Sequence, residues 1–413
     1  MINEETKPHL RPFSIFLLLV LLFYFQLPSL SPTMNSFLIY PLLGILAIYF
    51  FSTLSLYLNE CKKVRVITSA FLIVLFMIIE YAYVFFNITK GTQGFSFTTI
   101  KFMLCAVVLI PSYGVTTIDQ KKKIMIASIA ENLVIMLYLS FQYARYGDEY
   151  ANILQIGVTQ YASSHIFFVG AFFVFYLLAS SRRDKRIALV MIIASILFSL
   201  LVTQRGIVFF MTVILIFALI LFGRKNTRQQ FIITLVIGIL AVVIMINYEA
   251  ILMKFCDIIN SERLTIRIRR MIVLLQSGEM EEAGGSFNGR YELIKVSWDT
   301  FSSSFKNMMV GTGDQYGNTI IGHHSQFVDI LAQYGIMGGT VIVFMIKSFY
   351  KNLVYVSACS KSKIAKKCIV IIFLFYIIRG FIGTVFHSAI AVQMFCVVPF
   401  LCSYVLNQNK QEV

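Results

Sequence analysis

The segment GIVFFMTVILIFALILF, residues 206–222, decides the fold class of this chain because it contains no charged residue. As an α-helix that rises about 1.5 Å per residue, it extends over roughly 25 Å, close to the thickness of the hydrocarbon core of a bilayer. The run is also continuous, whereas the strands of a membrane barrel alternate between apolar and polar residues. Lipid offers the backbone no hydrogen-bond partners, so we predict a transmembrane helix here.

The composition of the whole chain agrees with this prediction. Hydrophobic residues make up 58% of the 413 positions and charged residues only 13%, whereas about a quarter of the residues of an ordinary soluble domain are charged. We therefore predict an all-α, polytopic membrane protein of about twelve transmembrane helices. The predicted spans cover residues 13–30, 36–58, 66–87, 98–118, 124–143, 161–180, 187–203, 206–222, 231–248, 335–350, 368–388 and 389–406.

The net charge of +15 is explained by the connections between these spans. Lysine and arginine gather in every second connection, at residues 62–65, 121–123, 182–186, 224–228 and 351–367. Positive charge in short loops marks the cytoplasmic side of a membrane protein. We therefore expect these loops and both termini in the cytoplasm, and we expect no nucleic acid as a partner.

One connection on the outer side is far longer than the others and divides the chain into three parts. Residues 1–248 hold nine spans, residues 249–334 form a large extracytoplasmic loop with amphipathic helices, and residues 335–413 hold three spans and a cytoplasmic tail. Loops longer than about 15 residues in a compact protein are usually functional. We therefore expect most of the polar chemistry of the protein in or beside this loop.

Two arginines at the outer side are candidate anion ligands. Arg205 stands between two apolar runs, directly before the span that begins at Gly206. The positive end of that helix would point outward and favour an anion beside Arg205. The alternative is an arginine that only extends its charge to the interface. Arg290, in the segment NGRYE with Tyr291 beside it, is either a second ligand or a solvated charge.

The densest polar pattern lies at residues 310–317, VGTGDQYG, and 322–338, GHHSQFVDILAQYGIMG. Gly311 and Gly313 permit tight backbone turns. His323 and His324 precede a predicted helix, for which Ser325 is a candidate N-cap. The histidines are either solvated loop residues or groups that transfer a proton or bind a phosphate. Adjacent histidines without further ligands make a poor metal site, so we expect no metal.

The helix after the histidines carries a polar face, because Gln326, Asp329 and Gln333 recur at helical spacing. Ionisable residues also fall inside predicted spans or at their outer ends, and burying charge in a bilayer is costly unless the group faces an interior cavity. We therefore expect an outward-open polar cavity capped by the long loop. The residues in question are Glu80, Lys101, His165, Arg379 and His387, with Glu131 deeper as a structural partner in the bundle.

This layout resembles the O-antigen polymerase (Wzy) and O-antigen ligase superfamily of bacterial polysaccharide assembly. Three pieces carry the resemblance: the TQRG segment at residues 203–206; Gly289 and Arg290 with Trp298, Phe301 and the GTG turn at 311–313; and His324 followed by Leu331, Gly335 and Gly338. The chain departs from the family pattern at three places, with Ser325 for the usual asparagine, Gln333 for the usual acidic residue, and Met308 and Met309 where a proline is usual.

The resemblance implies a GT-C-like, metal-independent membrane glycosyltransferase without a cofactor, in the bacterial cytoplasmic (inner) membrane. Its donor would be an oligosaccharide linked to undecaprenyl pyrophosphate. Arg205 and Arg290 would hold the pyrophosphate, because a guanidinium group suits phosphate oxygens. His324 would be the general base for the acceptor hydroxyl or a second phosphate contact. The candidate substrate-binding residues are His323, Gln326, Asp329, Tyr291, Gly311, Gly313 and Arg379.

Three activities follow from this pattern. The first is a polymerase that joins repeat units into a surface polysaccharide such as O-antigen or capsule, with the lipid bilayer and a chain-length regulator protein as further partners. The second is a ligase that transfers finished polymer to an acceptor. The third, from another class, is a flippase for lipid-linked saccharide, but its charged residues should line a path through the middle of the bilayer.

Overall fold

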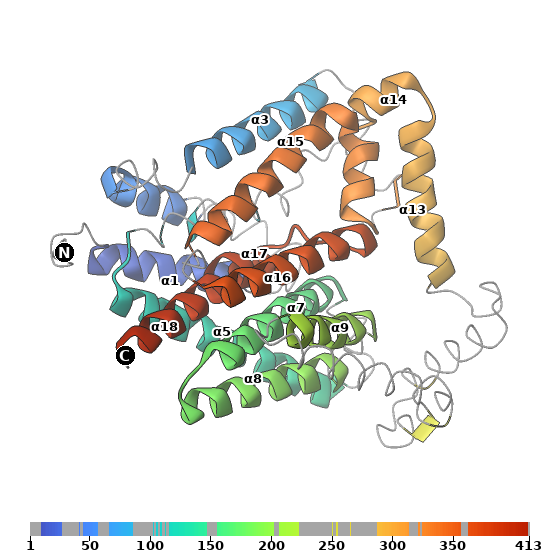
Figure 1. Cartoon of the computed structure of the whole chain (residues 1–413). Helices are drawn as coiled ribbons and strands as arrows, with labels where there is room; N and C mark the ends of the chain where they lie inside the picture. The colour runs from blue at the N-terminus through green and yellow to red at the C-terminus, as the bar shows by residue number, and fades with distance from the viewer. Residues whose placement is uncertain are drawn as a thin grey trace.

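The computed structural model describes residues 10–26, 41, 44–56, 66–85, 102, 105, 108–109, 112, 115–146, 155–201, 206–222, 250, 253–254, 265, 287–313, 321–322, 324–356 and 362–411 of the chain. In that part of the chain helices are the only regular secondary structure and no strand occurs. This confirms the predicted all-α class. Figure 1 shows the helices gathered into a bundle with a group of helices at one end.

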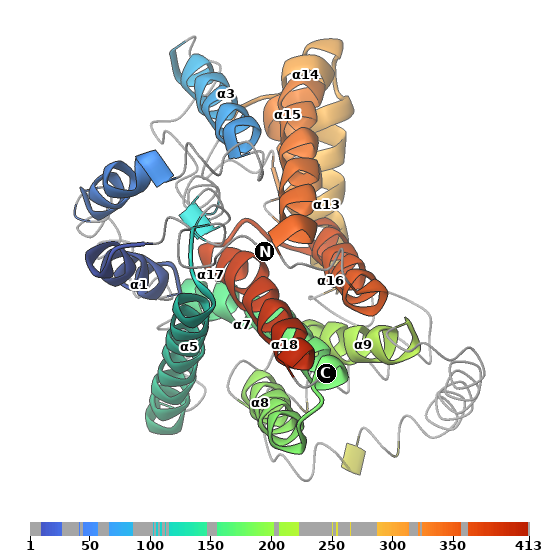
Figure 2. The ribbon, with the colours of Figure 1, turned by 60° about the vertical axis from the view of Figure 1, so that its left-hand side comes forward.

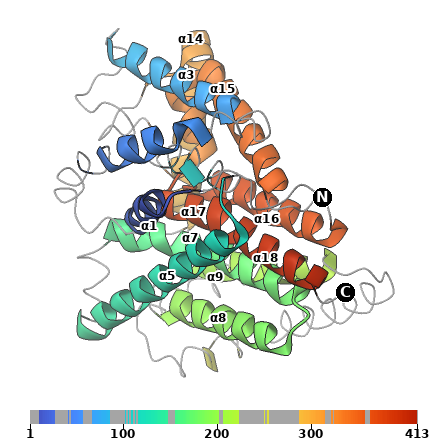
Figure 3. The same cartoon turned by 90° about the vertical axis from the view of Figure 1, so that its left-hand side faces the viewer.

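The helices of the bundle are α1 (Pro12–Gln26), α3 (Val66–Phe85), α5 (Ile118–Tyr146), α7 (Gln155–Leu178), α8 (Arg182–Leu201), α9 (Gly206–Phe222), α16 (Lys363–Ile382), α17 (Ser388–Val392), the π-helix η4 (Gln393–Val397) and α18 (Val398–Gln411). The remaining helices are α13 (Phe287–Ser302), α14 (Phe305–Val310) and α15 (Gln326–Val356). Helix α7 is central to the bundle because it packs against α8, α9, α16 and α18 (Figures 2 and 3).

Some of the described helices are suited to span a membrane. Three of them, Ile118–Tyr146, Gln326–Val354 and Ala389–Leu406, are long and apolar enough to cross a membrane. Shorter apolar helices are Pro12–Gln26, Gly44–Leu56, Ser163–Leu178 and Met211–Leu221. The number of twelve spans stays a prediction, since the predicted span at residues 231–248 lies outside the described residues.

The surface of α5 shows how these helices differ from those of a soluble protein. On one face Ile135 and Leu139 are buried against the bundle, while on the opposite face Val134, Leu137 and Phe141 are exposed. An apolar stripe of this kind on the surface of a water-soluble monomer would favour aggregation. Lipid is as apolar as these side chains, so the exposed face is suited to contact with acyl chains.

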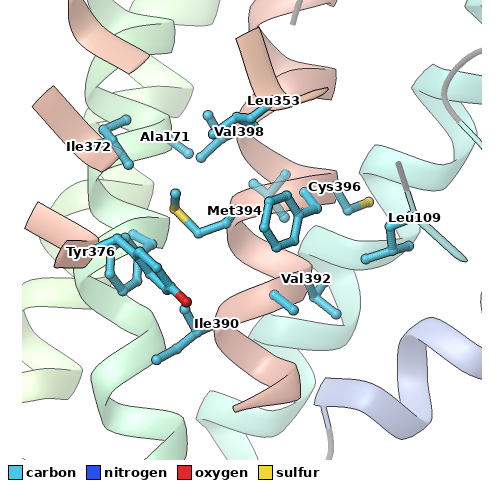
Figure 4. Close-up of a cluster of buried hydrophobic side chains, with 14 of the residues drawn as sticks. Leu109, Ala171, Leu353, Ile372, Tyr376, Ile390, Val392, Met394, Cys396 and Val398 are labelled. Atoms are coloured by element: carbon cyan, nitrogen blue, oxygen red, sulfur yellow. The ribbon is translucent and has the colours of Figure 1, made fainter. Parts of the chain in front are cut away.

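The core lies around the run α17–η4–α18, whose five π-helical residues are all buried. Figure 4 shows Met394 pointing from η4 toward Ile372 and Tyr376 of α16, while Cys396 points the other way, toward Leu109. Side chains from both sides of the bundle therefore pack against this one helical run. Its central place explains why Ala389–Leu406 is more deeply buried than the other two long candidate spans.

A polar cluster within the apolar bundle joins four helical elements at Asn132 of α5. The amide group of Asn132 donates to Gln26 of α1, and its oxygen accepts from Tyr161 of α7 at 3.0 Å and from Gln393 of η4 at 3.1 Å. Gln26 also donates to Glu131, as expected for a structural partner in the bundle. Unpaired polar groups are costly in an apolar interior, so this cluster fixes how the four elements face one another.

Helix α15 consists of two segments that meet at Gly335. The backbone there has φ 60° and ψ −164°, which is not helical and lies on the positive-φ side that favours glycine. The first segment packs against α13 and α14, and the helix also packs against α3. In Figure 1, α13 runs across one end of the molecule, opposite the start of α1 and the end of α18.

Candidate functional site

The candidate site surrounds the first segment of α15, between Gln326 and the break at Gly335. Three pieces of chain meet this segment: helix α13, the turn that follows α14, and the connection at residues 383–387 between α16 and α17. Most of the described side chains and backbone positions that the sequence singled out as candidates lie along this segment or touch it. The site is described below from the histidine outward.

His324 lies just before α15 and is exposed. Its Nδ1 atom is 3.0 Å from the carbonyl oxygen of Gly322. A carbonyl oxygen only accepts hydrogen bonds, so Nδ1 carries a proton, and in the neutral ring Nε2 carries the lone pair. The arrangement therefore presents Nε2 of His324 as a hydrogen-bond acceptor or a proton acceptor.

A buried carboxylate holds the chain on both sides of His324. One oxygen of Asp329 accepts a hydrogen bond from the hydroxyl group of Ser297 at 2.6 Å, and the other accepts from the backbone N–H of Ser325 at 2.9 Å. The oxygen of Ser297 in turn accepts from the backbone N–H of Gly322 at 2.9 Å. Asp329 thus connects α13 with the residues before and after the histidine.

The start of α15 confirms the predicted N-cap. The backbone N–H of Val328 donates to the hydroxyl oxygen of Ser325 at 3.5 Å, and the Asp329 side chain reaches back to the N–H of Ser325. These reciprocal bonds satisfy two of the four N–H groups that a helix start leaves without an intrahelical partner. Because the acidic side chain lies at the positive end of the helix, its charge is also favoured there.

The GTG turn caps the end of the first segment of α15. The break at Gly335 leaves the last carbonyl groups of that segment without partners from the next turn. The N–H of Thr312 donates to the carbonyl of Ala332 at 3.0 Å, and the N–H of Gly313 donates to that of Gln333 at 2.7 Å. Gly311 and Gly313 are predicted substrate-binding residues. In the structure the N–H of Gly313 is bonded to the α15 backbone and that of Gly311 to the carbonyl of Asn307, so their predicted role stays a prediction.

Two glycines allow the turn and the break to approach this closely. Gly311 has φ 78°, and a Cβ atom added there would overlap the carbonyl group of Gln333. A Cβ atom added at Gly335 would overlap the carbonyl group of Met309 on α14. Each glycine therefore lies against the backbone of the other element, and the pair locks α14 onto the break in α15.

Arg379 lies on the other side of the α15 start. Its side chain is buried in the last turn of α16, where Nη2 donates to the hydroxyl oxygen of Ser163 on α7 at 3.0 Å. Its guanidinium group lies against Gly383, since a Cβ atom there would overlap Nη1. The carbonyl of Gly383 accepts from the N–H of Gln326 at 3.2 Å. The structure thus brings a buried cation next to the helix start that follows His324.

The predicted polar face of α15 is divided among three partners. The side-chain oxygen of Gln326 accepts from the N–H of Phe386 at 3.4 Å. The side chain of Asp329 is bonded to Ser297 of α13 and to Ser325, while at Gln333 it is the backbone carbonyl that accepts from the GTG turn. Between them, the ring of Phe327 packs on the ring of Phe386 and against Gly380. The polar residues therefore hold the segment in place from several directions.

The two histidines within predicted spans have different surroundings. His387 is buried beside α17, with Nε2 2.8 Å from the hydroxyl oxygen of Thr384 in the same connection as Gly383. His165 is buried between the rings of Tyr161 and Phe198, with centroid distances of 4.8 and 4.7 Å, and its nitrogens have no hydrogen-bond partner among the described residues. His387 thus belongs to the polar connection beside Arg379, while His165 has an aromatic environment instead of the expected polar one.

Several predicted positions are not placed in space. Arg205 and His323 lie outside the described residues, as does Lys101, and the side chain of Glu80 is not described. Arg290 is placed only by its backbone, in the first turn of α13, one residue before the exposed Tyr291. The roles predicted for Arg205, Arg290 and His323 therefore stay predictions, and so does the polar cavity.

Two serines of the site had not been predicted. Ser297 lies on the buried face of α13 together with Phe301 one turn later, and a small polar residue on an apolar helix face is a signal that the sequence contains. Ser163 is one of two adjacent serines in α7, and nothing in the sequence distinguishes it as the partner of Arg379, which lies 216 positions later.

The described part of the chain contains no group of three or more His, Cys, Asp and Glu side chains that could hold a metal ion. The described site contains the imidazole of His324, the buried guanidinium of Arg379 and the hydrogen bonds that Ser297 and Asp329 make. In comparisons with known proteins, no family model matches the chain and no curated protein matches it.

Proposed function

We propose that this chain is a membrane glycosyltransferase that joins undecaprenyl-pyrophosphate-linked oligosaccharide repeat units into a surface polysaccharide, O-antigen or capsule. The observation that carries the proposal is the arrangement of His324, which is exposed and hydrogen-bonded through Nδ1 to Gly322, so that Nε2 presents a lone pair. A base held in this way, just before a capped helix, is suited to take a proton from a hydroxyl group.

In the proposed reaction, a sugar hydroxyl of the acceptor gives its proton to Nε2 of His324. Its oxygen forms a bond to the anomeric carbon of the donor. The bond between that carbon and the pyrophosphate oxygen breaks, and undecaprenyl pyrophosphate leaves with the electron pair. Negative charge grows on the leaving group during this step, so cationic groups fixed nearby lower the barrier.

Three arginines are the proposed source of that positive charge. Arg205 and Arg290 hold the pyrophosphate in this proposal, because a guanidinium group binds two phosphate oxygens at once. Arg379 supports it with a third cation, buried beside Gly383 and oriented by Ser163. A buried, oriented charge acts more strongly than one in water and needs little rearrangement during the reaction.

The proposed arrangement in the membrane has about twelve spans and both termini in the cytoplasm, with the reaction on the outer face of the bacterial cytoplasmic membrane. Basic residues in every second connection support it. The placement of α13 at the end opposite the start of α1 and the end of α18 is consistent with an outer loop and a cytoplasmic C-terminal tail (Figure 1). A protein that regulates chain length is a proposed partner.

The experiment is a gel of surface polysaccharide from a deletion strain that expresses wild-type protein, His324→Ala or a control. Thr340→Ala is the control, because Thr340 is exposed on α15 and its hydroxyl group bonds to the carbonyl of Ile336 in its own helix. Wild type and Thr340→Ala should give a ladder of long chains, and His324→Ala should give only the single-repeat band at an equal membrane level.

Two outcomes would overturn parts of this proposal. A full ladder from His324→Ala would remove the histidine from the chemistry. Long polymer that accumulates unattached in the deletion strain would replace the polymerase by a ligase that works on the same kind of donor.

A further inference from the structure

We infer that Ser297 and Asp329 are positioning residues that fix the tautomer and the place of His324 through the backbone of Gly322. The inference rests on the proposed function only in naming His324 as the base. Asp329, Ser297, Gly322 and His324 are joined by successive hydrogen bonds, and we call these four residues the clamp. The clamp selects one form of the neutral imidazole whatever the reaction, so it has its own experimental test.

The direction of each hydrogen bond in the clamp follows from its chemistry. An ionised Asp329 only accepts, so the single hydroxyl proton of Ser297 points at the carboxylate oxygen 2.6 Å away. The lone pairs of the Ser297 oxygen then remain for a donor, and the N–H of Gly322 fills that role at 2.9 Å. Ser297 has no other proton to offer, so the order of the bonds cannot be reversed.

Gly322 links Ser297 to His324 through its backbone. Its N–H is held by Ser297, and its carbonyl accepts from Nδ1 of His324 at 3.0 Å. The tautomer of a histidine is set by the hydrogen bond that one ring nitrogen makes. As long as the carbonyl of Gly322 stays in place, the proton of the neutral ring remains on Nδ1 and the lone pair on Nε2.

Burial makes the clamp rigid. Ser297 is 0% exposed and Asp329 is 4% exposed, so neither group can exchange its partner for bulk water without an opening of the structure. A buried donor or acceptor left without a partner costs on the order of 1–3 kcal/mol. Each bond of the clamp therefore depends on the next one being made.

The fit of Gly322 against α13 leaves the loop little freedom. A Cβ atom added at Gly322 would overlap the carbonyl oxygen of Leu293, one turn before Ser297 on the same helix. On the other side of the histidine, the N–H of Ser325 is held by Asp329 at 2.9 Å. His324 is thus bracketed by two anchored positions that share one carboxylate.

The experiment reads the tautomer directly. The full chain is labelled with ¹⁵N-histidine, placed in lipid bilayers in alkaline buffer where histidine rings are neutral, and measured by ¹⁵N NMR. The chain has five histidines, and a difference spectrum against His324→Ala assigns the signals of His324. Wild-type protein should show His324 with the proton on Nδ1, and a wild-type ring protonated on Nε2 would overturn the inference.

Two variants test the clamp. Ser297→Ala removes the acceptor of the Gly322 N–H, and Asp329→Asn disturbs the acceptor of the Ser297 proton. Both should convert the His324 signal to a mixture of tautomers or to the Nε2-protonated form, which predominates for neutral histidine in water. Ser302→Ala is the matched control on α13, because the exposed Ser302 hydroxyl bonds only to carbonyl groups of its own helix.

The same spectra report whether each variant is folded, since His165 is buried between aromatic rings elsewhere in the bundle and its signal should not move. If one variant unfolds, the wild-type spectrum and the other variant still show whether the clamp fixes the tautomer of His324. An unchanged Nδ1-protonated signal in a folded Ser297→Ala or Asp329→Asn protein would overturn the inference. Failure of the proposed function would appear instead as a full polysaccharide ladder from His324→Ala, whatever the tautomer.

Discussion

The backbone amide of Gly313 donates to the carbonyl oxygen of Gln333 over 2.7 Å, and this bond joins the turn after α14 to the break in α15. The first segment of α15 ends at that break, so its last carbonyl groups need donors from elsewhere. The turn supplies them, and the two glycines at 311 and 335 let the backbones approach. Helix α14 and its turn are thereby attached to a predicted span at one defined place.

Replacement of Gly335 by alanine should destabilise the protein. The residue has φ 60°, and its Cβ atom would overlap the carbonyl group of Met309, so the cost is about 1–3 kcal/mol from the backbone conformation alone. Gly339→Ala is the matched control four residues later, where the added atom meets only the end of the flexible Leu331 side chain.

Thermal unfolding in detergent measures both variants, and fluorescence of Trp298, the single tryptophan of the chain, reports the packing of α13. We expect a lower midpoint for Gly335→Ala than for Gly339→Ala. Equal midpoints would show that the break in α15 does not require a glycine.

Replacement of Asn132 by alanine should loosen the bundle. The variant removes the side chain that Gln26 and Gln393 share, while Tyr161 keeps the backbone carbonyl of residue 132 as an acceptor. Hydrogen bonds between membrane helices are worth about 0.6 kcal/mol each on average, so the loss should amount to roughly 1–2 kcal/mol. Leu137→Ala, on the exposed face of the same helix, is the control.

The measurement is the fraction of protein that stays folded after stepwise heating, followed by size-exclusion chromatography. Asn132→Ala should lose its folded peak several degrees below wild type, while Leu137→Ala should match wild type. A midpoint for Asn132→Ala equal to that of wild type would mean that the polar cluster does not stabilise the bundle.

Two replacements of Arg379 should distinguish the effect of its charge on activity from the effect of its planar shape. Arg379→Leu removes the cation, and under the proposed function polymer synthesis should fall roughly 100- to 1,000-fold, the range seen when a group that stabilises transition-state charge is lost. Arg379→Lys keeps a charge without the planar group that Ser163 orients, so it should retain an intermediate activity.

The polysaccharide gel, with membrane levels matched by blotting, distinguishes these cases. Ser163→Ala serves as a milder variant, because it removes one hydrogen bond of Arg379 and leaves the guanidinium in place. Wild-type ladders from both Arg379→Leu and Arg379→Lys would show that the buried cation has no part in the reaction.

Parts of the fold were predictable because they depend on short segments of sequence. The apolar run at residues 206–222 corresponds to α9, and the predicted span at 66–87 corresponds to α3 at Val66–Phe85. The predicted beginning of a span at residue 335 coincides with the break in α15. In each case the continuous apolar pattern, or the glycine that interrupts it, is sufficient to set the boundary.

The network around His324 depends instead on contacts between distant residues. Ser297 and Asp329 are 32 positions apart, and Arg379 and Ser163 are 216 apart. The helical spacing of Gln326, Asp329 and Gln333 predicts that they share a face, but which partner each one meets depends on the loops that pack around the helix. Those loops are arranged by tertiary packing, and this packing cannot be derived from the spacing of residues in one sequence.

The bond between Gln326 and Gly383 also has a consequence for how the protein is made. A chain leaves the ribosome from its N-terminus, so α15 is synthesised before the connection that holds its first turn. Until α16 and Gly383 have been synthesised, the amide of Gln326 and the ring of Phe327 lack these partners. The helix start after His324 therefore cannot adopt its final arrangement before then. The candidate site is thus completed late in biosynthesis. A nascent chain released before Gly383 should contain every residue of the clamp but lack the hydrogen bond between Gln326 and Gly383.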